Sequence, residues 1–316
     1  MQMKKTERKA IIVGCARDCE DFLPAVLKNI TMIANLYSQA FFVFVENDSK
    51  DNTRDILRQW LIRRAHSLLV CLDGLSAQET RRTARLAIAR NAYMEALHPH
   101  LEKFDHLVVL DFDNVNTNLI SEESLAAAIE FLDSSKENAA VFANQARYYD
   151  IWALRHDVWC PGDCWLEVEN RPAYLPLHRA VERYVTNRQL RIHPAAPPVS
   201  VQSAFGGLAI YKLNFVRAAR YVGVLSNGSE ICEHVAFNGT AVRAGGLLYI
   251  FPKLVNQVAP EHINQRLSGL RRLAADLDLR SYKFYPTLVP IFLRCKGFPS
   301  TRAVINYINP DFLAHD

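Results

Sequence analysis

The chain has 316 residues, of which 50% are hydrophobic and 22% are charged, and its formal net charge is +4 at pH 7. This composition is typical of a globular protein with a sizeable core, and it argues against intrinsic disorder. The charge is too small to indicate nucleic-acid binding. No stretch approaches the roughly 18 apolar residues that a membrane-spanning helix requires. We therefore expect a folded protein whose partners do not include nucleic acid.

The N-terminal part of the sequence alternates between apolar runs and segments of helical periodicity. Continuous apolar strands joined by helices are typical of a parallel sheet that is covered on both faces. We therefore predict an α/β fold with a central, mostly parallel sheet flanked by helices. The predicted strands are 9–16, 40–48, 66–74 and 104–113, and the predicted helices are 20–38, 49–65 and 79–101.

The remaining sequence is less regular. One more helix is predicted at 122–132, where Ser121 precedes two glutamates, and the later segments carry proline and glycine punctuation. We interpret the chain as a single domain, 1–316, made of a ligand-binding half at 1–115 and an irregular second half at 116–316. The apolar and basic stretch 284–298 is expected to be a packed C-terminal element.

Acidic side chains end most of the predicted strands. In an open α/β sheet, ligands collect at the carboxyl ends of the strands. No G-x-G-x-x-G or G-x-x-x-x-G-K sequence is present, so neither a dinucleotide fold nor a P-loop is supported. An acid-rich edge requires cations, and Mg²⁺ or Mn²⁺ bridging to phosphates is one solution. The side chains at these ends are Arg17, Glu46, Asp48, Asp73, Asp111 and Asp113.

The fourth strand ends in "DFD". Alternation places Asp111 and Asp113 on one side of the backbone and Phe112 on the other. One alternative is that the aspartates cap the strand end and interact with water. The other is that they share a divalent ion that bridges to a diphosphate. The position at the end of a fourth strand favours the metal site.

An arginine-rich helix precedes this strand. Arg82, Arg85 and Asn91 are spaced so that they share roughly one flank of it. This flank is either a solvated basic face that pairs with Glu79 and Glu95, or a set of cations for a diphosphate-linked ligand.

Five motifs together resemble the GT-A-fold glycosyltransferases, and in particular the fungal capsule-type α-1,3-mannosyltransferases and their bacterial relatives. They are "VGCARDCEDFLPAVLKNI", "FVENDSKDNTRDILRQWL", "RLAIARNAYMEAL", "FDHLVVLDFDN" and "ARYYDIWALRH", and the resemblance spans roughly residues 10–160. It implies a GT-A-like domain and a Mn²⁺- or Mg²⁺-dependent transfer of a sugar from a nucleotide-sugar donor to a glycan or polysaccharide acceptor. GDP-mannose is the donor that it suggests. The resemblance leaves open whether the configuration at the anomeric carbon is retained or inverted.

The resemblance also assigns roles to residues. Asp111 and Asp113 match the pair that holds the metal on the diphosphate. In "NGSEICEHVAF", Glu233 matches a catalytic carboxylate that faces the reacting sugar, and His234 is a candidate to complete the metal shell. Alternatively, Glu233 only stabilises a helix start and His234 is structural. The expected nucleotide-sugar contacts are Arg17, Glu46, Asp48, Arg82, Arg85, Asn91 and Asp111.

Two other functions remain open from the sequence. A nucleotidyltransferase would release pyrophosphate rather than a nucleoside diphosphate, and it usually has a glycine-rich loop after the first strand. A non-catalytic carbohydrate-binding protein would gain no thermal stability from nucleotides. We expect a cytoplasmic location, with peripheral association at the inner face of the membrane.

Overall fold

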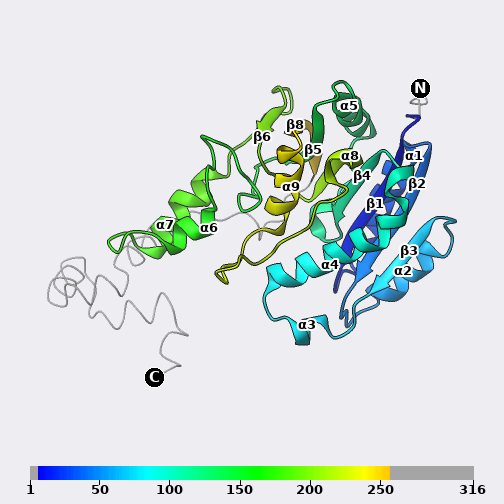
Figure 1. Cartoon of the computed structure of the whole chain (residues 1–316), viewed down its shortest axis with the longest axis horizontal. Coiled ribbons are helices and arrows are strands. Elements are labelled where there is room, and N and C mark those ends of the chain that lie inside the picture. Colours follow the sequence, from blue (N-terminus) through cyan, green and yellow to red (C-terminus); the bar gives the residue numbers. More distant parts are fainter. Residues whose placement is uncertain (1–5, 257–316) are drawn as a thin grey trace, which may run out of the picture. The chain divides into compact units, whose positions relative to one another are not determined.

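The computed structural model describes residues 6–256, so the predicted C-terminal element at 284–298 lies outside the described residues. The described chain divides into two compact units. One comprises residues 6–163 and 189–256, and the other comprises residues 164–188. The first unit contains the whole sheet, whose strand order is β3-β2-β1-β4-β7-β5-β8-β6 (Figure 1).

The first four strands run parallel to one another, as predicted. Strands β5 and β8 are also parallel to each other, whereas β7 is antiparallel to both β4 and β5, and β6 is antiparallel to β8. The mostly parallel sheet is therefore confirmed. The strands are β1 (Lys9–Ala16), β2 (Gln39–Glu46), β3 (Ser67–Cys71), β4 (His106–Asp111), β5 (Asn138–Gln145), β6 (Val199–Val201), β7 (Leu208–Lys212) and β8 (Leu247–Asn256).

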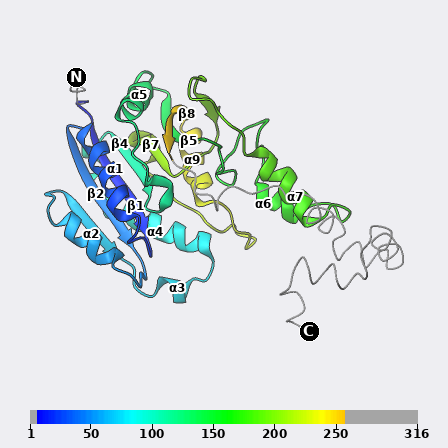
Figure 2. The ribbon, with the colours of Figure 1, turned by 180° about the vertical axis from the view of Figure 1, so that it is seen from behind.

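Helices cover both faces of this sheet, as Figures 1 and 2 show from opposite sides. Helices α1, α2 and α5 pack on one face, where they share a hydrophobic core with the inward side chains of the strands. Helices α4 and α9 contact each other, and α4 packs on β1 and β2. The helices of this unit are α1 (Leu23–Asn35), α2 (Thr53–Leu61), α3 (Leu75–Gln78), α4 (Arg82–Leu97), α5 (Glu122–Asp133), α8 (Leu213–Val216) and α9 (Glu233–Arg243), with 3₁₀ turns η1 (His98–Lys103) and η2 (Asn114–Asn116).

Strand alternation decides which side chains of β4 reach each face. Phe112 is 1% exposed and lies edge-on to Phe44, 4.7 Å between ring centroids, in the core beneath α1 and α2. Gly14 of β1 makes room for this ring, because a Cβ there would lie 2.1 Å from it. Asp111 therefore projects to the opposite face, which is the face covered by α4. The predicted separation of Phe112 from Asp111 is confirmed, whereas Asp113 lies beyond the end of β4 and caps the next turn.

The second unit is a short helical segment. It holds α6 (Cys164–Glu169), α7 (Leu177–Tyr184) and the turn η3 (Thr186–Arg188). An ion pair between Arg188 and Glu167 joins the two ends of this segment, with Nη2 3.1 Å from Oε1.

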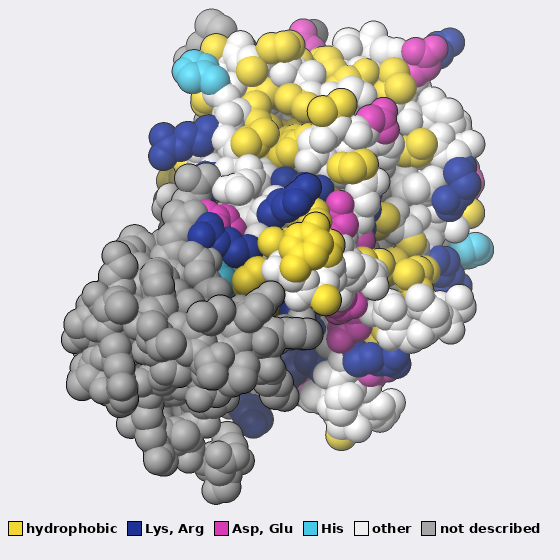
Figure 3. Space-filling model, turned by 90° about the vertical axis from the view of Figure 1, so that its left-hand side faces the viewer, with side chains coloured by type: hydrophobic (Ala, Val, Ile, Leu, Met, Phe, Trp, Pro, Cys, Tyr) yellow, Lys and Arg dark blue, Asp and Glu magenta, His cyan; other side chains and the backbone are white. Residues whose placement is uncertain are grey.

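Among residues 6–256, no helix is long and apolar enough to cross a membrane. On the face shown in Figure 3, acidic and basic side chains are interspersed, and neither sign forms a continuous surface. This distribution agrees with the small net charge of +4.

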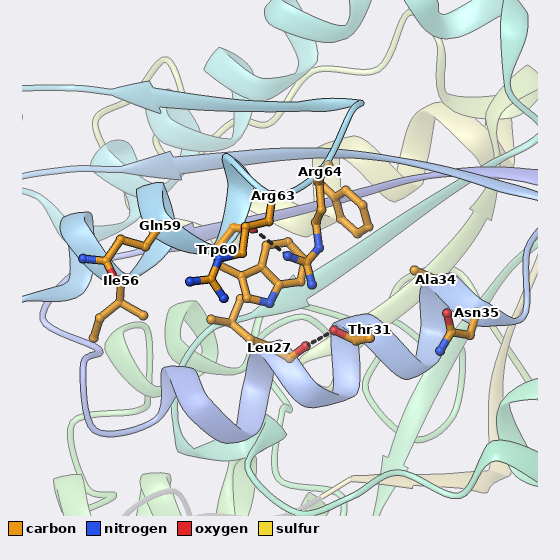
Figure 4. Close-up of a pocket in the computed structure, with 10 residues that line it drawn as sticks. Leu27, Thr31, Ala34, Asn35, Ile56, Gln59, Trp60, Arg63 and Arg64 are labelled. Atoms are coloured by element: carbon orange, nitrogen blue, oxygen red, sulfur yellow. Dashed lines mark hydrogen bonds between the residues drawn. The ribbon is translucent and has the colours of Figure 1, made fainter.

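A surface groove of about 730 Å³ opens between α1 and α2 (Figure 4). The guanidinium of Arg64 covers the ring of Trp60, 3.1 Å from its centroid, and Nη1 donates to the Trp60 carbonyl, 2.6 Å away. None of the predicted site residues lines this groove. It is therefore separate from the acidic strand ends.

Candidate active site

The two aspartates at the end of β4 are held differently. Asp111 Oδ1 accepts from Arg90 Nη2 at 2.8 Å, and Asp113 Oδ1 accepts from the backbone N–H of Val115 at 3.1 Å. The second contact caps the turn η2, so part of the capping alternative is correct. Yet the Oδ2 atom of each aspartate has no hydrogen-bond partner among residues 6–256. The pair therefore keeps two carboxylate oxygens available.

Burial and mutual repulsion affect this pair. Burial first, and then the negative charge of Asp111, raise the pKa of Asp113 above its ordinary value. The positive charges of Arg82 and Arg90 oppose that rise. A cation beside both carboxylates would offset the repulsion.

Arg90 connects β4 with the start of α9. Its side chain is 3% exposed, and its Nε donates to Glu233 Oε1 at 3.0 Å while Nη2 contacts Asp111. Arg90 lies on the arginine-rich helix, but it is not part of the flank of Arg82, Arg85 and Asn91 that the sequence assigned to the site. The buried guanidinium therefore brings the predicted metal-site aspartate and the predicted catalytic glutamate to a common partner.

Glu233 begins α9, and its side chain is 6% exposed. The neighbouring His234 stacks on Phe205, with ring centroids 3.7 Å apart, and neither ring nitrogen has a hydrogen-bond partner among the described residues. Burial, together with the charge of Arg90, lowers the pKa of His234 well below its usual range. The imidazole is therefore neutral, which is the form that binds metal ions.

The acids that follow β2 are engaged by the protein. Glu46 is fully buried, and it accepts from the Ser49 N–H at 2.8 Å and pairs with Arg54. Asp48 accepts from the N–H groups of Gly74 and Ser76, at 2.6 and 2.7 Å, and from the Ser76 hydroxyl. These bonds, that of the Ser76 hydroxyl first, hold the pKa of Asp48 well below its ordinary value. Both acids thus fix the loops that follow β2 and β3.

The flank of α4 divides into exposed and engaged residues. Arg82 is exposed, whereas Arg85 donates to the carbonyls of Glu79 and Thr80 and so ties the start of α4 to the preceding loop. Asn91 exchanges two hydrogen bonds of 2.9 Å with the backbone of Tyr221. The charge of Arg82 opposes the rise in the pKa of Asp113, so this exposed arginine lies near the "DFD" motif. Arg17, in the loop after β1, has its Nε 3.6 Å from Asp18.

Sequence reasoning did not single out Asp150, although the resemblance included its segment. Its carboxylate accepts from the Gly206 N–H at 3.0 Å and from the Ala153 N–H at 3.4 Å. The residue after Gly206 is Gly207, and its carbonyl accepts from the Asp111 N–H at 3.0 Å. Burial, followed by the charges of Asp111 and Glu233, raises the pKa of Asp150 to about 6. Asp150 therefore belongs to the same acidic cluster.

The two glycines of "SAFGGLAIY" form the turn that connects these groups. Both have positive φ, +67° at Gly206 and +82° at Gly207, and a Cβ on Gly206 would lie 2.6 Å from the Ala143 carbonyl. Buried amides hold the turn: Gln145 and Asn256 donate to the Gly206 carbonyl, and Asn116 donates to that of Gly207. The glycines are therefore required by the backbone path of this turn.

The donor atoms suit a hard divalent cation. Within the described part of the chain, no group of three or more His, Cys, Asp or Glu residues forms a metal-binding cluster. Asp111 and Asp113 together fit the alternative in which one or two carboxylates and a ligand's phosphates share the ion.

The sheet order and the paired aspartates at the end of β4 agree with the α/β fold and the acidic strand edge that the sequence predicts. The sequence matches the family described as Cryptococcal mannosyltransferase 1 over residues 9–241. The match covers most of the 316 residues, so the chain belongs to this family. The predicted class, a glycosyltransferase, is confirmed, and the nucleotidyltransferase and non-catalytic alternatives are not favoured.

Solved structures show a fainter likeness. The mannosyltransferase PcManGT from Pyrobaculum calidifontis, in complex with GDP-Man and Mn²⁺, has 15% identity and a TM-score of 0.46 over 96% of this chain and 68% of that chain. TarS from S. aureus has 13% identity and a TM-score of 0.44, covering 95% and 81%. Glucosyl-3-phosphoglycerate synthase from Mycobacterium tuberculosis has 12% identity and a TM-score of 0.35, covering 93% and 80%. Comparison with curated proteins gives no match.

Proposed function

We propose that this protein transfers a mannosyl residue from a nucleotide sugar, with GDP-mannose as the first donor to test, to a glycan or polysaccharide acceptor in a divalent-metal-dependent reaction. The observation that carries the metal site is the pair of available oxygens on Asp111 and Asp113. Membership of the mannosyltransferase family supports the reaction class. Residues 1–115 would supply the donor-binding half and residues 116–316 the acceptor-side half.

The proposed site assigns one task to each group. Asp111 and Asp113 would hold Mn²⁺ or Mg²⁺ on the diphosphate. His234 is not proposed as a third ligand, because no group of three such residues forms a metal-binding cluster in the described part of the chain. The ion would stabilise the negative charge that develops on the leaving nucleoside diphosphate. Arg82 would add positive charge beside the same phosphates. Arg17 is a further proposed donor contact. The expected contacts Glu46, Asp48, Arg85 and Asn91 are bonded to the protein itself, so we do not propose them as donor contacts.

Glu233 is the proposed catalytic carboxylate. An inverting reaction requires a base that accepts the proton of the acceptor hydroxyl, whereas a front-face retaining reaction does not. Glu233 stands at the start of α9, beside Arg90. Its replacement by glutamine therefore distinguishes the two stereochemical courses: loss of transfer supports inversion, and near-normal transfer supports retention.

The experiment that tests the function measures GDP release from GDP-mannose, with mannosylated acceptors as co-substrates, in the presence and absence of Mn²⁺. We expect release to require the ion and to be lost after EDTA treatment. UDP-glucose in a parallel assay tests the choice of donor. Metal-independent release, or no release from either donor and no stabilisation by GDP with Mn²⁺, would overturn the proposal.

We also propose a cytoplasmic location with peripheral association at the inner face of the membrane. The mildly basic net charge of +4 supports it, because cytoplasmic leaflets are anionic. Co-sedimentation with vesicles that contain phosphatidylserine, compared with neutral vesicles, is the test. Equal recovery in both supernatants would contradict the association.

A further inference from the structure

Arg90 occupies a buried position between two groups to which the proposed function gives different tasks. Its rigid guanidinium presents Nε to Glu233 at 3.0 Å and Nη2 to Asp111 at 2.8 Å. The same plane lies over Phe205 and Tyr221, with Cζ 5.2 and 5.7 Å from their ring centroids. Three elements therefore meet at one side chain: α4 supplies Arg90, β4 ends at Asp111, and α9 begins at Glu233.

The arrangement does more than neutralise charge. Adjacent nitrogens of a planar guanidinium lie at a fixed separation, and here each contacts a different carboxylate. A lysine ammonium would keep the positive charge, but it is a single point on a flexible stem and fixes no such separation. The distance between the two carboxylates thus depends on the shape of arginine as well as on its charge.

We infer that Arg90 is a positioning residue that sets the relation between the metal-holding Asp111 and the catalytic Glu233. The inference rests on the proposed function. Asp111 belongs to the donor-binding half and Glu233 to the acceptor-side half, so Arg90 couples the two halves of the reaction. Its Nη1 is buried and makes no hydrogen bond among the described residues, so the hydrogen bonds that orient the guanidinium are those to Asp111 and Glu233.

A merely structural ion pair predicts a different result. If Arg90 only neutralised buried acids, a lysine that keeps the charge would preserve activity, and any loss would follow the loss of stability. If Arg90 sets geometry, lysine keeps much of the stability but lowers the turnover rate. The two roles therefore separate in the comparison of Arg90→Lys with Arg90→Met.

The experiment uses the full chain with GDP-mannose and Mn²⁺ as the probe, and water as the acceptor. It measures kcat and KM for donor hydrolysis, the dissociation constant of GDP with Mn²⁺, and the urea midpoint. We expect Arg90→Lys to lower kcat by about 10- to 100-fold, with KM changed less than about threefold. Arg90→Met should lower kcat further and also weaken GDP binding. The matched control is Arg220→Met, which removes an exposed pair with Glu95.

Coupling to Glu233 is tested by combining Arg90→Lys with Glu233→Gln. We expect the second substitution to remove most of the effect of the first on kcat, because the group being positioned is gone. Wild-type kcat in Arg90→Lys, or fully additive losses in the double variant, would overturn the inference while leaving the proposed function standing. Absence of both GDP binding and hydrolysis in the wild-type protein would overturn the proposed function and the inference with it.

Discussion

Two acidic strand ends lie on the same edge of the sheet, and they differ in how much of each carboxylate the protein itself uses. The acids after β2, Glu46 and Asp48, form what we call the closed pair, since arginine, serine and backbone donors occupy both oxygens of each. The aspartates after β4, Asp111 and Asp113, form the open pair, since each keeps one oxygen without a partner among residues 6–256.

An acid at a strand end therefore does not by itself indicate a ligand. Carboxylates that accept several hydrogen bonds order the loops around them, and their removal lowers stability. Carboxylates that are kept near one another with oxygens unused are costly to the folded state, so a ligand is the simplest reason for their presence. The predictions below test this contrast, starting with the largest expected effect.

Asp113→Asn should separate activity from stability. The asparagine Oδ1 can still accept from the Val115 N–H, so the turn remains capped. Because the folded state raises the pKa of Asp113, ionisation costs stability as the pH rises, and asparagine removes that loss. We expect Mn²⁺-dependent turnover to fall by about 100-fold or more, while the urea midpoint at pH 8 stays equal or rises. A variant that loses stability and keeps its turnover would place Asp113 with the closed pair.

Glu46→Gln should show the opposite pattern. Its amide would face Arg54 in place of a buried carboxylate oxygen, and we expect a loss of about 3 kcal/mol in the free energy of unfolding. Urea denaturation measures it. The matched control is Asp73→Asn, which removes the other partner of Arg54; that carboxylate is 74% exposed, so its loss should be below about 1 kcal/mol. Unchanged stability with lost donor binding would instead make Glu46 a ligand contact.

The regular half of the fold was predictable because its signals are local. Apolar runs located β1 and β4 to within a few residues, and alternation correctly separated Phe112 from Asp111. The antiparallel insertion of β7 between β4 and β5 was not predicted, since alternation within a strand does not name its neighbours.

The site residues that the sequence did not predict are positioned by contacts between residues far apart in the chain. Arg82 and Arg90 look alike in sequence, but one is exposed and the other 3% exposed, and that depends on which face of α4 packs on the sheet. Asp150 lies in an irregular loop and is oriented by Gly206, 56 residues further along the chain. Because the fold brings Arg90 and Asp150 to the site, the sequence around each of them carries no local signal of this role.

The glycine turn beneath the open pair should be sensitive to a single methyl group. In Gly206→Ala, the Cβ would meet the Ala143 carbonyl at 2.6 Å in a left-handed conformation, and we expect a loss of about 2 kcal/mol. Gly228→Ala is the control, because φ is also positive there, +87°, but nothing lies within 4 Å; it should lose about 1 kcal/mol. Urea denaturation measures the free energy of unfolding of both variants. Equal losses in the two would mean that the turn shifts to accommodate the added methyl group.

Asp150→Asn tests whether the acidic cluster extends to this third carboxylate. The folded state raises its pKa from 3.8 to about 6, so between these values the folded protein binds more protons than the unfolded chain. Wild-type stability should therefore fall relative to Asp150→Asn as the pH rises from about 4 to 6, by roughly 1 kcal/mol because the side chain is only partly buried. Urea denaturation of both proteins at pH 4.5, 5.5 and 7.5 measures the difference. A difference that does not change with pH would mean that Asp150 ionises as it does in the unfolded chain, and the charges of Asp111 and Glu233 would then not reach it.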